Sequence, residues 1–286
     1  MKQAILITAY TNLAMLQRII DWFDMDFDFY IHIDRKCSED YSFLSRYSNV
    51  HVYSRYRVTW GSDRHLMAIL CLINHAVQAG TDYSYVHLIT GADFPIKSPD
   101  QFRQFFNESN RTNYMEFYSL PHSAWMGEGG LERLRYYWIG HRWVDPRNRS
   151  LSLCMNLSVK VQRKLHYSRN LHFVPQLYGG GTYWSLTGDA VRYLAEQMNA
   201  HRMRAHFMHT HIAEEIWAQT LLLNAPQFKV ENDYKRFMRW IGNAASPTIL
   251  TEADYDELIA SPAFFARKFV LGQSDSIMDK LTNAVF

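Results

Sequence analysis

Two adjacent glutamates, Glu214 and Glu215, stand at the start of a segment with helical periodicity, residues 213–224. Successive residues of a helix point about 100° apart, so only one of the two carboxylates can face a given pocket. A lone carboxylate in a pocket can act as a general base, whereas a glycoside hydrolase needs two carboxylates that flank one bond. The alternative is that both acids only interact with the dipole of the helix start. The pattern therefore disfavours a glycoside hydrolase. It is consistent with one glutamate acting as a general base, or with both glutamates only stabilising the start of the helix.

Two further patterns could hold a metal ion. The acidic cluster Asp24–Asp28 contains an Asp-x-Asp, which binds the metal in many enzymes that use nucleotide sugars. It precedes a predicted strand, at the end of the sheet opposite the usual ligand cleft, and we interpret it as a solvated loop. His211 and Glu215 are four residues apart, with His209 nearby, but catalytic zinc sites usually have three protein ligands and no HExxH motif is present. We expect no metal site.

Short apolar runs alternate with helical segments in the first part of the chain, which predicts βαβ units and a largely parallel α/β sheet. In such sheets, ligands bind at the carboxyl ends of the strands. Neither a GxGxxG nor a P-loop motif occurs. The predicted strands are 3–8, 29–34, 50–53 and 85–90, and the predicted helices are 13–23 and 63–79. The residues at the strand ends are Ala9, Tyr10, Asp34 and 91–93.

The second half of the chain carries basic and glycine-rich segments. The sequence of residues 131–138 predicts a basic, aromatic helix, which either lines an acceptor groove or projects its arginines into water. The basic run 142–149 is typical of a surface loop. Three glycines, 179–181, precede a predicted strand and allow unusual dihedrals or close backbone approach. Arg267 and Lys268 stand among bulky apolar residues. Such cations can bind phosphate, and a surface helix is the alternative.

The overall composition suits a soluble globular protein. The 286 residues are 20% charged and 48% hydrophobic with a net charge of +2, which excludes a disordered tail and disfavours nucleic-acid binding. No linker divides the chain, so we expect one domain over 1–286, with a nucleotide-binding half (1–120) and an acceptor and catalytic half (121–286). Three scattered cysteines indicate a reducing compartment. Without an apolar run of about 20 residues, the protein is expected in the cytoplasm, with at most peripheral membrane contact.

Six segments spread over nearly the whole chain share the pattern of one family. They are FYIHIDRK (29–36), VTWGS (58–62), HLITGADFPIKS (87–98), GGGTYWSLTGDAV (179–191), AEEIWAQTLLLN (213–224) and SPAFFARKF (261–269). In this order they resemble the core-2/I-branching β-1,6-N-acetylglucosaminyltransferases and the related peptide O-xylosyltransferases. The resemblance covers the catalytic domain, without the membrane anchor and disulfides of the animal Golgi members. It therefore implies a bacterial-type relative.

The resemblance implies a GT-A fold, a UDP-sugar donor, inversion at the anomeric carbon and no metal cofactor. GlcNAc is the first candidate for the sugar and xylose the second, and the acceptor would be a glycan or a lipid-linked oligosaccharide. Two alternatives stay open. One is a non-catalytic relative that binds nucleotide sugars or glycans, and the other is a metal-dependent glycosyltransferase that uses Asp24–Asp28.

The same resemblance assigns roles to individual residues. The family's catalytic glutamate closes a Pro-Asp-Glu motif, and Ala213-Glu214-Glu215 stands in its place, so the base falls on Glu215. The phosphate-binding lysine falls on Lys268. The family's diphosphate arginine has no match in its neighbourhood, 243–247, and Arg239 and Arg267 are the candidates to replace it. The resemblance also places Asp34 near uracil and ribose and Trp60 (a tyrosine in animal members) near the donor. Ala9 and Tyr10, at the end of the first predicted strand, are the other expected donor contacts. The expected acceptor contacts are Asp93, Arg133, Arg135, Gly181, Thr182 and Trp240.

Overall fold

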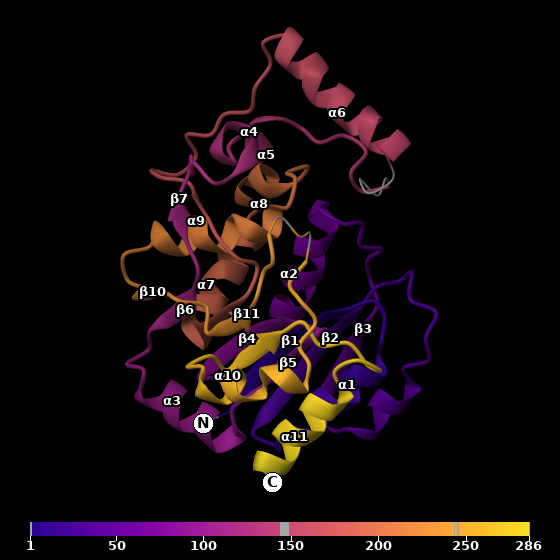
Figure 1. Cartoon of the computed structure of the whole chain (residues 1–286). Helices are drawn as coiled ribbons and strands as arrows, with labels where there is room; N and C mark the ends of the chain where they lie inside the picture. Colours follow the sequence, from indigo (N-terminus) through magenta and orange to yellow (C-terminus); the bar gives the residue numbers. More distant parts are fainter. Residues whose placement is uncertain (1, 144–148, 243, 245, 286) are drawn as a thin grey trace.

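The computed structural model describes residues 2–143, 149–242, 244 and 246–285, which are organised around a seven-stranded sheet with helices on both faces (Figure 1). The strand order is β10-β6-β9-β4-β1-β2-β3. All neighbouring strands are parallel except β9, which is antiparallel to both β4 and β6. The strands are β1 (Gln3–Ala9), β2 (Phe27–Ile33), β3 (Val50–Tyr53), β4 (Tyr85–Thr90), β6 (Asn113–Met115), β9 (Trp184–Thr187) and β10 (Val230–Asn232). The predicted α/β fold with a mostly parallel sheet is confirmed.

Strand β1 shows why the apolar runs become central strands. Ile5 and Ile7 belong to the core on one face of the sheet, and Ala4 and Leu6 belong to the core on the other face. All four side chains are completely buried. A strand that is covered on both faces needs a continuous apolar run, because neither face meets water.

The helices divide between the two faces. Those packed on the core of Ile5 are α1 (Ala14–Asp21), α3 (Pro99–Glu108), α10 (Tyr255–Ala260) and α11 (Asp275–Val285), and those on the core of Leu6 are α2 (Asp63–Gln78), α7 (Gly188–Asn199), α8 (His201–Phe207) and α9 (Trp217–Leu223). Ser62 caps α2 by accepting a hydrogen bond from the N–H of Arg64. Among the described residues, no helix has both the length and the apolar character that a bilayer span requires.

A smaller sheet lies beside the main one. It consists of β11 (Arg236–Met238), β12 (Phe265–Arg267) and β5 (Asp93–Pro95), in that order. The alternative of a surface helix for 261–269 is therefore wrong, because the main chain of this segment pairs with two strands. A strand pair, β7 (Tyr118–Ser119) with β8 (Tyr178–Gly179), completes the sheets.

Two predictions for residues 131–149 differ from the structure. The helix predicted over 131–138 is only α5 (Glu132–Arg135), because Tyr136 is extended and the N–H of Trp138 donates to the carbonyl of His209 at 3.0 Å. A short turn, α4 (Met126–Gly129), precedes it. Of the loop predicted over 142–149, residues 144–148 lie outside the described residues. Arg149 begins a long helix, α6 (Arg149–Lys164), which projects from the far end of the molecule (Figure 1).

Candidate active site

The carboxyl ends of β1, β2 and β4 lie together at one edge of the sheet. The N–H of Asp34 donates to the carbonyl of Ala9 at 2.8 Å, and the N–H of Gly91 donates to the carbonyl of Thr8 at 3.0 Å. A Cβ on Gly91 would lie 3.1 Å from the Cβ of Ala9, so glycine lets the two strand ends approach closely. Tyr10 projects into solvent beside them. The structure thus brings Ala9, Tyr10 and Asp34 to the edge where strand order predicts them.

Asp34 is buried and holds the segment that leads to Trp60. Its Oδ1 accepts the N–H of Lys36 at 2.8 Å, and its Oδ2 accepts the N–H of Val58 at 3.1 Å. Both carboxylate oxygens are therefore occupied by main-chain donors. The Trp60 side chain, two residues beyond Val58, is more than half exposed and meets the ring of His211 edge-on, with 5.8 Å between the ring centroids. An exposed indole ring is a surface on which a ligand can stack.

Gly61 fixes the backbone that precedes the two glutamates. It has φ +69°, and a Cβ there would lie 2.5 Å from Cε1 of His211. Its carbonyl accepts the N–H of Ile212 at 2.9 Å. Ile212 has φ 51°, a left-handed conformation that is strained for a β-branched residue. The glycine of the VTWGS segment therefore holds a strained turn directly before Glu214.

The two glutamates lie on the 3₁₀ turn η2 (Ala213–Glu215), which Ile216 separates from α9. The continuous helix predicted over 213–224 is therefore wrong at its start. Oε1 of Glu214 lies 3.0 Å from Nδ1 of His65, whose Nε2 lies 3.1 Å from Oγ1 of Thr8. Oε2 of Glu215 accepts a hydrogen bond from Nη1 of Arg133 at 2.8 Å. The carboxylates diverge, as predicted: Glu214 is tied to the end of β1, and Glu215 faces Arg133.

The environment of Glu215 favours a stronger base. Its side chain is 30% exposed. Burial raises the pKa of Glu215, and the positive charge of Arg133 opposes this rise. The Arg133 guanidinium also lies 3.9 Å from the ring centroid of Trp125, which holds it in place. A carboxylate with a raised pKa is a better proton acceptor, because its pKa is closer to neutral pH.

The glycine run allows close approach between main chains. A Cβ on Gly180 would lie 1.9 Å from the carbonyl oxygen of Glu116, and the N–H of Gly180 donates to the carbonyl of Glu215 at 2.9 Å. None of the three glycines has a positive φ, so close packing and not an unusual dihedral explains the run. The carbonyl of Gly181 accepts from Nε2 of Gln219 at 2.7 Å, and Thr182 follows half-buried.

Glu116 is a site residue that sequence reasoning missed. Burial raises the pKa of Glu116, and its negative charge contributes to the raised pKa of Glu215. It directly follows β6, which is parallel to β4 because both strands are antiparallel to β9. The strand-end rule applied to β1, β2 and β4 would have found Glu116 if the end of β6 had been predicted at Met115.

Arg267 lies at the end of β4. Its Nη1 donates to Oγ1 of Thr90 and lies 3.4 Å from Oδ2 of Asp93. Asp93, expected to contact the acceptor, is buried and also accepts from Oγ1 of Thr90 at 2.7 Å, so it faces the strand end and Arg267. Burial raises the pKa of Tyr183, Arg267 lowers it, and the charges of Asp93 and Glu215 raise it. The Arg267 guanidinium lies 5.5 Å from the ring centroid of Tyr183, so Tyr183 borders the cation at this strand end.

The other predicted cations differ in their surroundings. Lys268 is half-buried, and its side chain forms no ion pair with any of the described residues. Arg239 is ion-paired with Asp254 at 2.5 Å and with Glu257. Of the two arginines predicted for the diphosphate, only Arg267 lies at the strand ends. Asn243 and Ala245, in the segment where the family arginine was expected, lie outside the described residues.

The remaining predicted acceptor residues have different partners from Asp93. Arg133 pairs with Glu215, whereas Arg135 lies 3.0 Å from Oε2 of Glu128 in a separate ion pair. Trp240 follows β11 and is about half exposed. Among these, Arg133 and Gly181 lie next to the proposed base or to the glycine run that contacts it.

The acidic cluster Asp24–Asp28 lies at the amino end of β2, away from the strand ends that carry Asp34. Asp24 and Asp26 are exposed and pair with Arg103. Asp28 is buried inside β2 and pairs with Lys2 at 2.7 Å. The cluster is thus at the end of the sheet where the sequence predicts it, although Asp28 belongs to the strand and not to a solvated loop.

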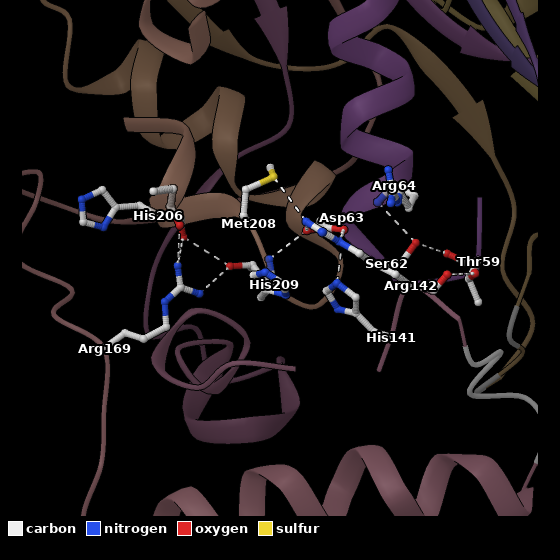
Figure 2. A network of polar contacts seen from close by, with 12 residues as sticks. Thr59, Ser62, Asp63, Arg64, His141, Arg142, Arg169, His206, Met208 and His209 are labelled. Atoms are coloured by element: carbon white, nitrogen blue, oxygen red, sulfur yellow. Dashed lines mark hydrogen bonds and ion pairs between the residues drawn. The ribbon is translucent and has the colours of Figure 1, made fainter. Parts of the chain in front are cut away.

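A second set of metal-type ligands surrounds Asp63 (Figure 2). Ligand atoms of Asp63, His141 and His209 lie within 4.8 Å of one another. Arg142, however, donates from Nε at 2.7 Å and from Nη2 to the two oxygens of Asp63, and the N–H of His209 donates to Oδ2 at 2.9 Å. Since the guanidinium already neutralises the carboxylate, we interpret the set as an ion-pair network that anchors the start of α2. His211 is not part of it, because its ring stacks on Trp138.

The family model of the core-2/I-branching enzymes matches residues 4–258. The chain belongs to this family. This family member is 24% identical to mouse xylosyltransferase 1 over 88% of its own length and 28% of the mouse protein. It is 23% identical to a Ciona intestinalis xylosyltransferase over 96% of its own length and 32% of that protein. It therefore spans about a third of the length of these curated relatives.

The family membership confirms the resemblance, and the curated relatives that the chain matches are xylosyltransferases. Among solved structures, 4-diphosphocytidyl-2C-methyl-D-erythritol synthase from Anaerococcus prevotii aligns over 80% of this chain and 86% of its own, with 13% identity and a TM-score of 0.37.

Proposed function

We propose that this family member moves a sugar from a UDP-sugar to a hydroxyl of a glycan acceptor, with inversion and without a metal ion. One observation carries the proposal: the fixed cation Arg267 lies 5.5 Å from the ring centroid of Tyr183, and Gly180, three residues before Tyr183, donates its N–H to the carbonyl of Glu215 at 2.9 Å. A base and a cation in one region suit a displacement at the anomeric carbon of the donor sugar. The base takes the proton of the attacking hydroxyl, and the cation stabilises the negative charge of the departing UDP.

Glu215 is the proposed general base. It takes the proton of the acceptor hydroxyl while that oxygen attacks the anomeric carbon from the face opposite UDP, and the bond from that carbon to the diphosphate oxygen breaks. A carboxylate is a weak base toward a free hydroxyl, so proton transfer becomes favourable only as the new bond forms. Such catalysis contributes about 10²–10⁴-fold to the rate.

Lys268 and Arg267 are the proposed partners of the departing diphosphate. Without a divalent ion, fixed cations must stabilise the charge that develops on UDP, and preorganised groups do so without reorganisation. Arg267 is held by Thr90 and Asp93, and Lys268 has no competing carboxylate among the described residues. Arg239 is a weaker candidate, since two carboxylates already bind it.

UDP-GlcNAc and UDP-xylose are the proposed donors, the first from the resemblance and the second from the names of the relatives. Ala9, Tyr10, Asp34 and Trp60 are the proposed surroundings of the nucleotide, in the half 1–120. The half 121–286 would supply the base and bind the acceptor, a glycan or a lipid-linked oligosaccharide. We place this activity in the cytoplasm, with peripheral contact to a membrane.

The test is a thermal-shift and UDP-release panel with UDP-GlcNAc, UDP-xylose and other UDP-sugars, with and without EDTA. We expect one UDP-sugar to raise the melting temperature and to release UDP with a glycan acceptor, in both cases unaffected by EDTA. Loss of release in EDTA would support the metal-dependent alternative. Binding without UDP release in the presence of any acceptor would support the non-catalytic alternative.

Replacing Lys268 with alanine is expected to weaken UDP binding about 10-fold to 100-fold, because a hydrogen bond to a charged group contributes about 1.5–3 kcal/mol. The rate of transfer should fall as well, since the same charge acts on the leaving group. Calorimetric titration with UDP and a UDP-release assay measure the two effects. Lys229→Ala, at an exposed lysine, is the control. Unchanged affinity and rate in Lys268→Ala would reject the assignment.

Replacing Arg133 with methionine is expected to move the acid limb of the pH profile of kcat/KM to higher pH. Arg133 lowers the pKa of Glu215, so its removal raises that pKa, and the base becomes protonated at a higher pH. Arg133→Lys keeps a positive charge and should shift the limb less. An acid limb that stays in place in Arg133→Met would show that Glu215 is not the titrating base.

A further inference from the structure

Helix α6 exposes a continuous apolar stripe. Leu153, Leu157 and Val161, and Leu165 just after the helix, are 65%, 58%, 47% and 71% exposed. Because residues four apart lie on the same face of a helix, these side chains form one line. The helix is attached through its other side, where Met155 and Val159 are buried and Gln162 hydrogen-bonds the main chain of Tyr137. The stripe therefore lies on the side of α6 that does not pack against the rest of the protein.

The stripe belongs to a larger apolar end of the molecule. Of the fourteen large hydrophobic side chains that are exposed among the described residues, eight lie within 126–167. Besides the stripe, these are Met126, Ile139, Trp143 and Tyr167. Scattered exposed hydrophobic residues are normal, whereas a concentration in one region marks an interaction site. This region, with α4, α5 and α6, forms the end of the molecule farthest from α11 (Figure 1).

The charge beside the stripe is positive. Lys160 and Lys164 are exposed and form no ion pair with any described residue. The nearby acids Glu128 and Glu132 are already paired, with Arg135 and Arg163. The sequence contains no aspartate or glutamate between Asp145 and Asp189. The exposed face of α6 therefore combines apolar side chains with unneutralised lysines.

We propose that α6 docks this protein on an anionic lipid surface, with the stripe inserted among the headgroups and Lys160 and Lys164 beside lipid phosphates. An apolar face flanked by lysines, with a tryptophan nearby, is the composition of helices that lie in the membrane interface. A second copy of the chain fits less well, because a self-association through α6 would bring the lysines of both copies together without acids to pair them. The docking adds a location to the proposed transfer to lipid-linked acceptors, but it does not depend on that activity.

The test is flotation of the full chain with vesicles. Vesicles of phosphatidylcholine alone are compared with vesicles of equimolar phosphatidylcholine and phosphatidylglycerol. We expect about tenfold or greater preference for the anionic vesicles, reduced by high salt, since each lysine near an anionic surface strengthens binding.

Two double variants separate the apolar and the charged contributions. Leu157→Asp with Val161→Asp should reduce binding to anionic vesicles about tenfold or more. Lys160→Glu with Lys164→Glu should remove the preference for anionic lipid. The matched controls are Ile259→Asp, at an exposed apolar residue on α10, and Lys229→Glu, and both should bind like the wild type. All substituted positions are exposed, so the variants should melt like the wild type.

Three results would overturn the docking. One is wild-type protein that does not float with either vesicle. Another is unchanged flotation of Leu157→Asp with Val161→Asp. The last is a concentration-dependent dimer that this double variant disperses, without any vesicle binding. UDP release with a soluble acceptor is measured on the same samples, so the failure of docking and the failure of the proposed transfer are distinguishable.

Discussion

Glu215→Gln is expected to lower kcat for sugar transfer about 10²–10⁴-fold, because an amide cannot take the proton of the acceptor hydroxyl. The glutamine oxygen can still accept the hydrogen bond of Arg133, so the site should keep its geometry. UDP affinity should therefore stay close to that of the wild type. UDP release measures kcat, and calorimetric titration with UDP measures the affinity.

The neighbouring glutamate provides the matched control. Glu214→Gln removes a carboxylate that contacts His65, whereas Arg133 donates to Glu215. We expect a smaller loss of kcat, because the change acts only through the position of η2. If Glu214→Gln abolished transfer and Glu215→Gln retained it, the base would be Glu214 and the alignment with the Pro-Asp-Glu motif would be shifted by one residue.

Asp63→Ala is expected to destabilise the protein by about 3 kcal/mol, because it leaves the guanidinium of Arg142 without its buried partner. We take the low end of the range for broken buried pairs, since the side chain of Arg142 is 21% exposed and can partly rehydrate. At roughly 2–4 °C per kcal/mol for a large domain, the melting temperature should fall by about 6–12 °C. Thermal and urea unfolding measure the effect.

A surface pair provides the comparison for Asp63. Asp82 is ion-paired with Arg192 at 3.2 Å and is 90% exposed, so Asp82→Ala should change stability by less than about 1 kcal/mol. Equal losses in the two variants would mean that the network around Asp63 contributes nothing beyond an ordinary surface pair.

The contribution of Asp63 should also depend on pH. Burial favours a raised pKa, but hydrogen bonds from His141, Arg142 and the N–H of His209 outweigh it, so the pKa of Asp63 lies well below its usual range. A carboxylate with a lowered pKa stabilises the folded state above its unfolded pKa of about 3.9, and this stabilisation is lost as the pH falls below it. The difference in stability between wild type and Asp63→Ala should therefore shrink in acid.

The parallel strands of the first part of the chain could be predicted from the sequence. The secondary structure of the second half of the chain largely could not. Strands β1, β2 and β4 are largely apolar and are buried along nearly their whole length, because helices cover both faces of the sheet there. The helix predicted over 131–138 failed because contacts distant in sequence, such as the hydrogen bond from Trp138 to His209, override local propensity. Helix α6 carried a readable signal in Leu153, Leu157 and Val161, spaced four residues apart.

The site shows the same division. The divergence of Glu214 and Glu215 follows from their adjacency, and the position of Asp34 follows from the order of the strands. The partner of Glu215 does not follow from any local pattern, since Arg133 is 82 residues away in the sequence. Similarly, only the fold shows that Gly180 must be glycine to pass the carbonyl of Glu116.

The reversed strand β9 has a consequence for how the chain acquires its structure during synthesis. β4 and β6 are made early, yet each pairs with β9 and not with the other, and β9 ends at Thr187. Until Thr187 has left the ribosome, β4 and β6 each have an unpaired edge. Unpaired strand edges are sites at which nascent chains aggregate. The nascent polypeptide should therefore need chaperone protection over the interval between β6 and β9, and slower translation there would increase its misfolding.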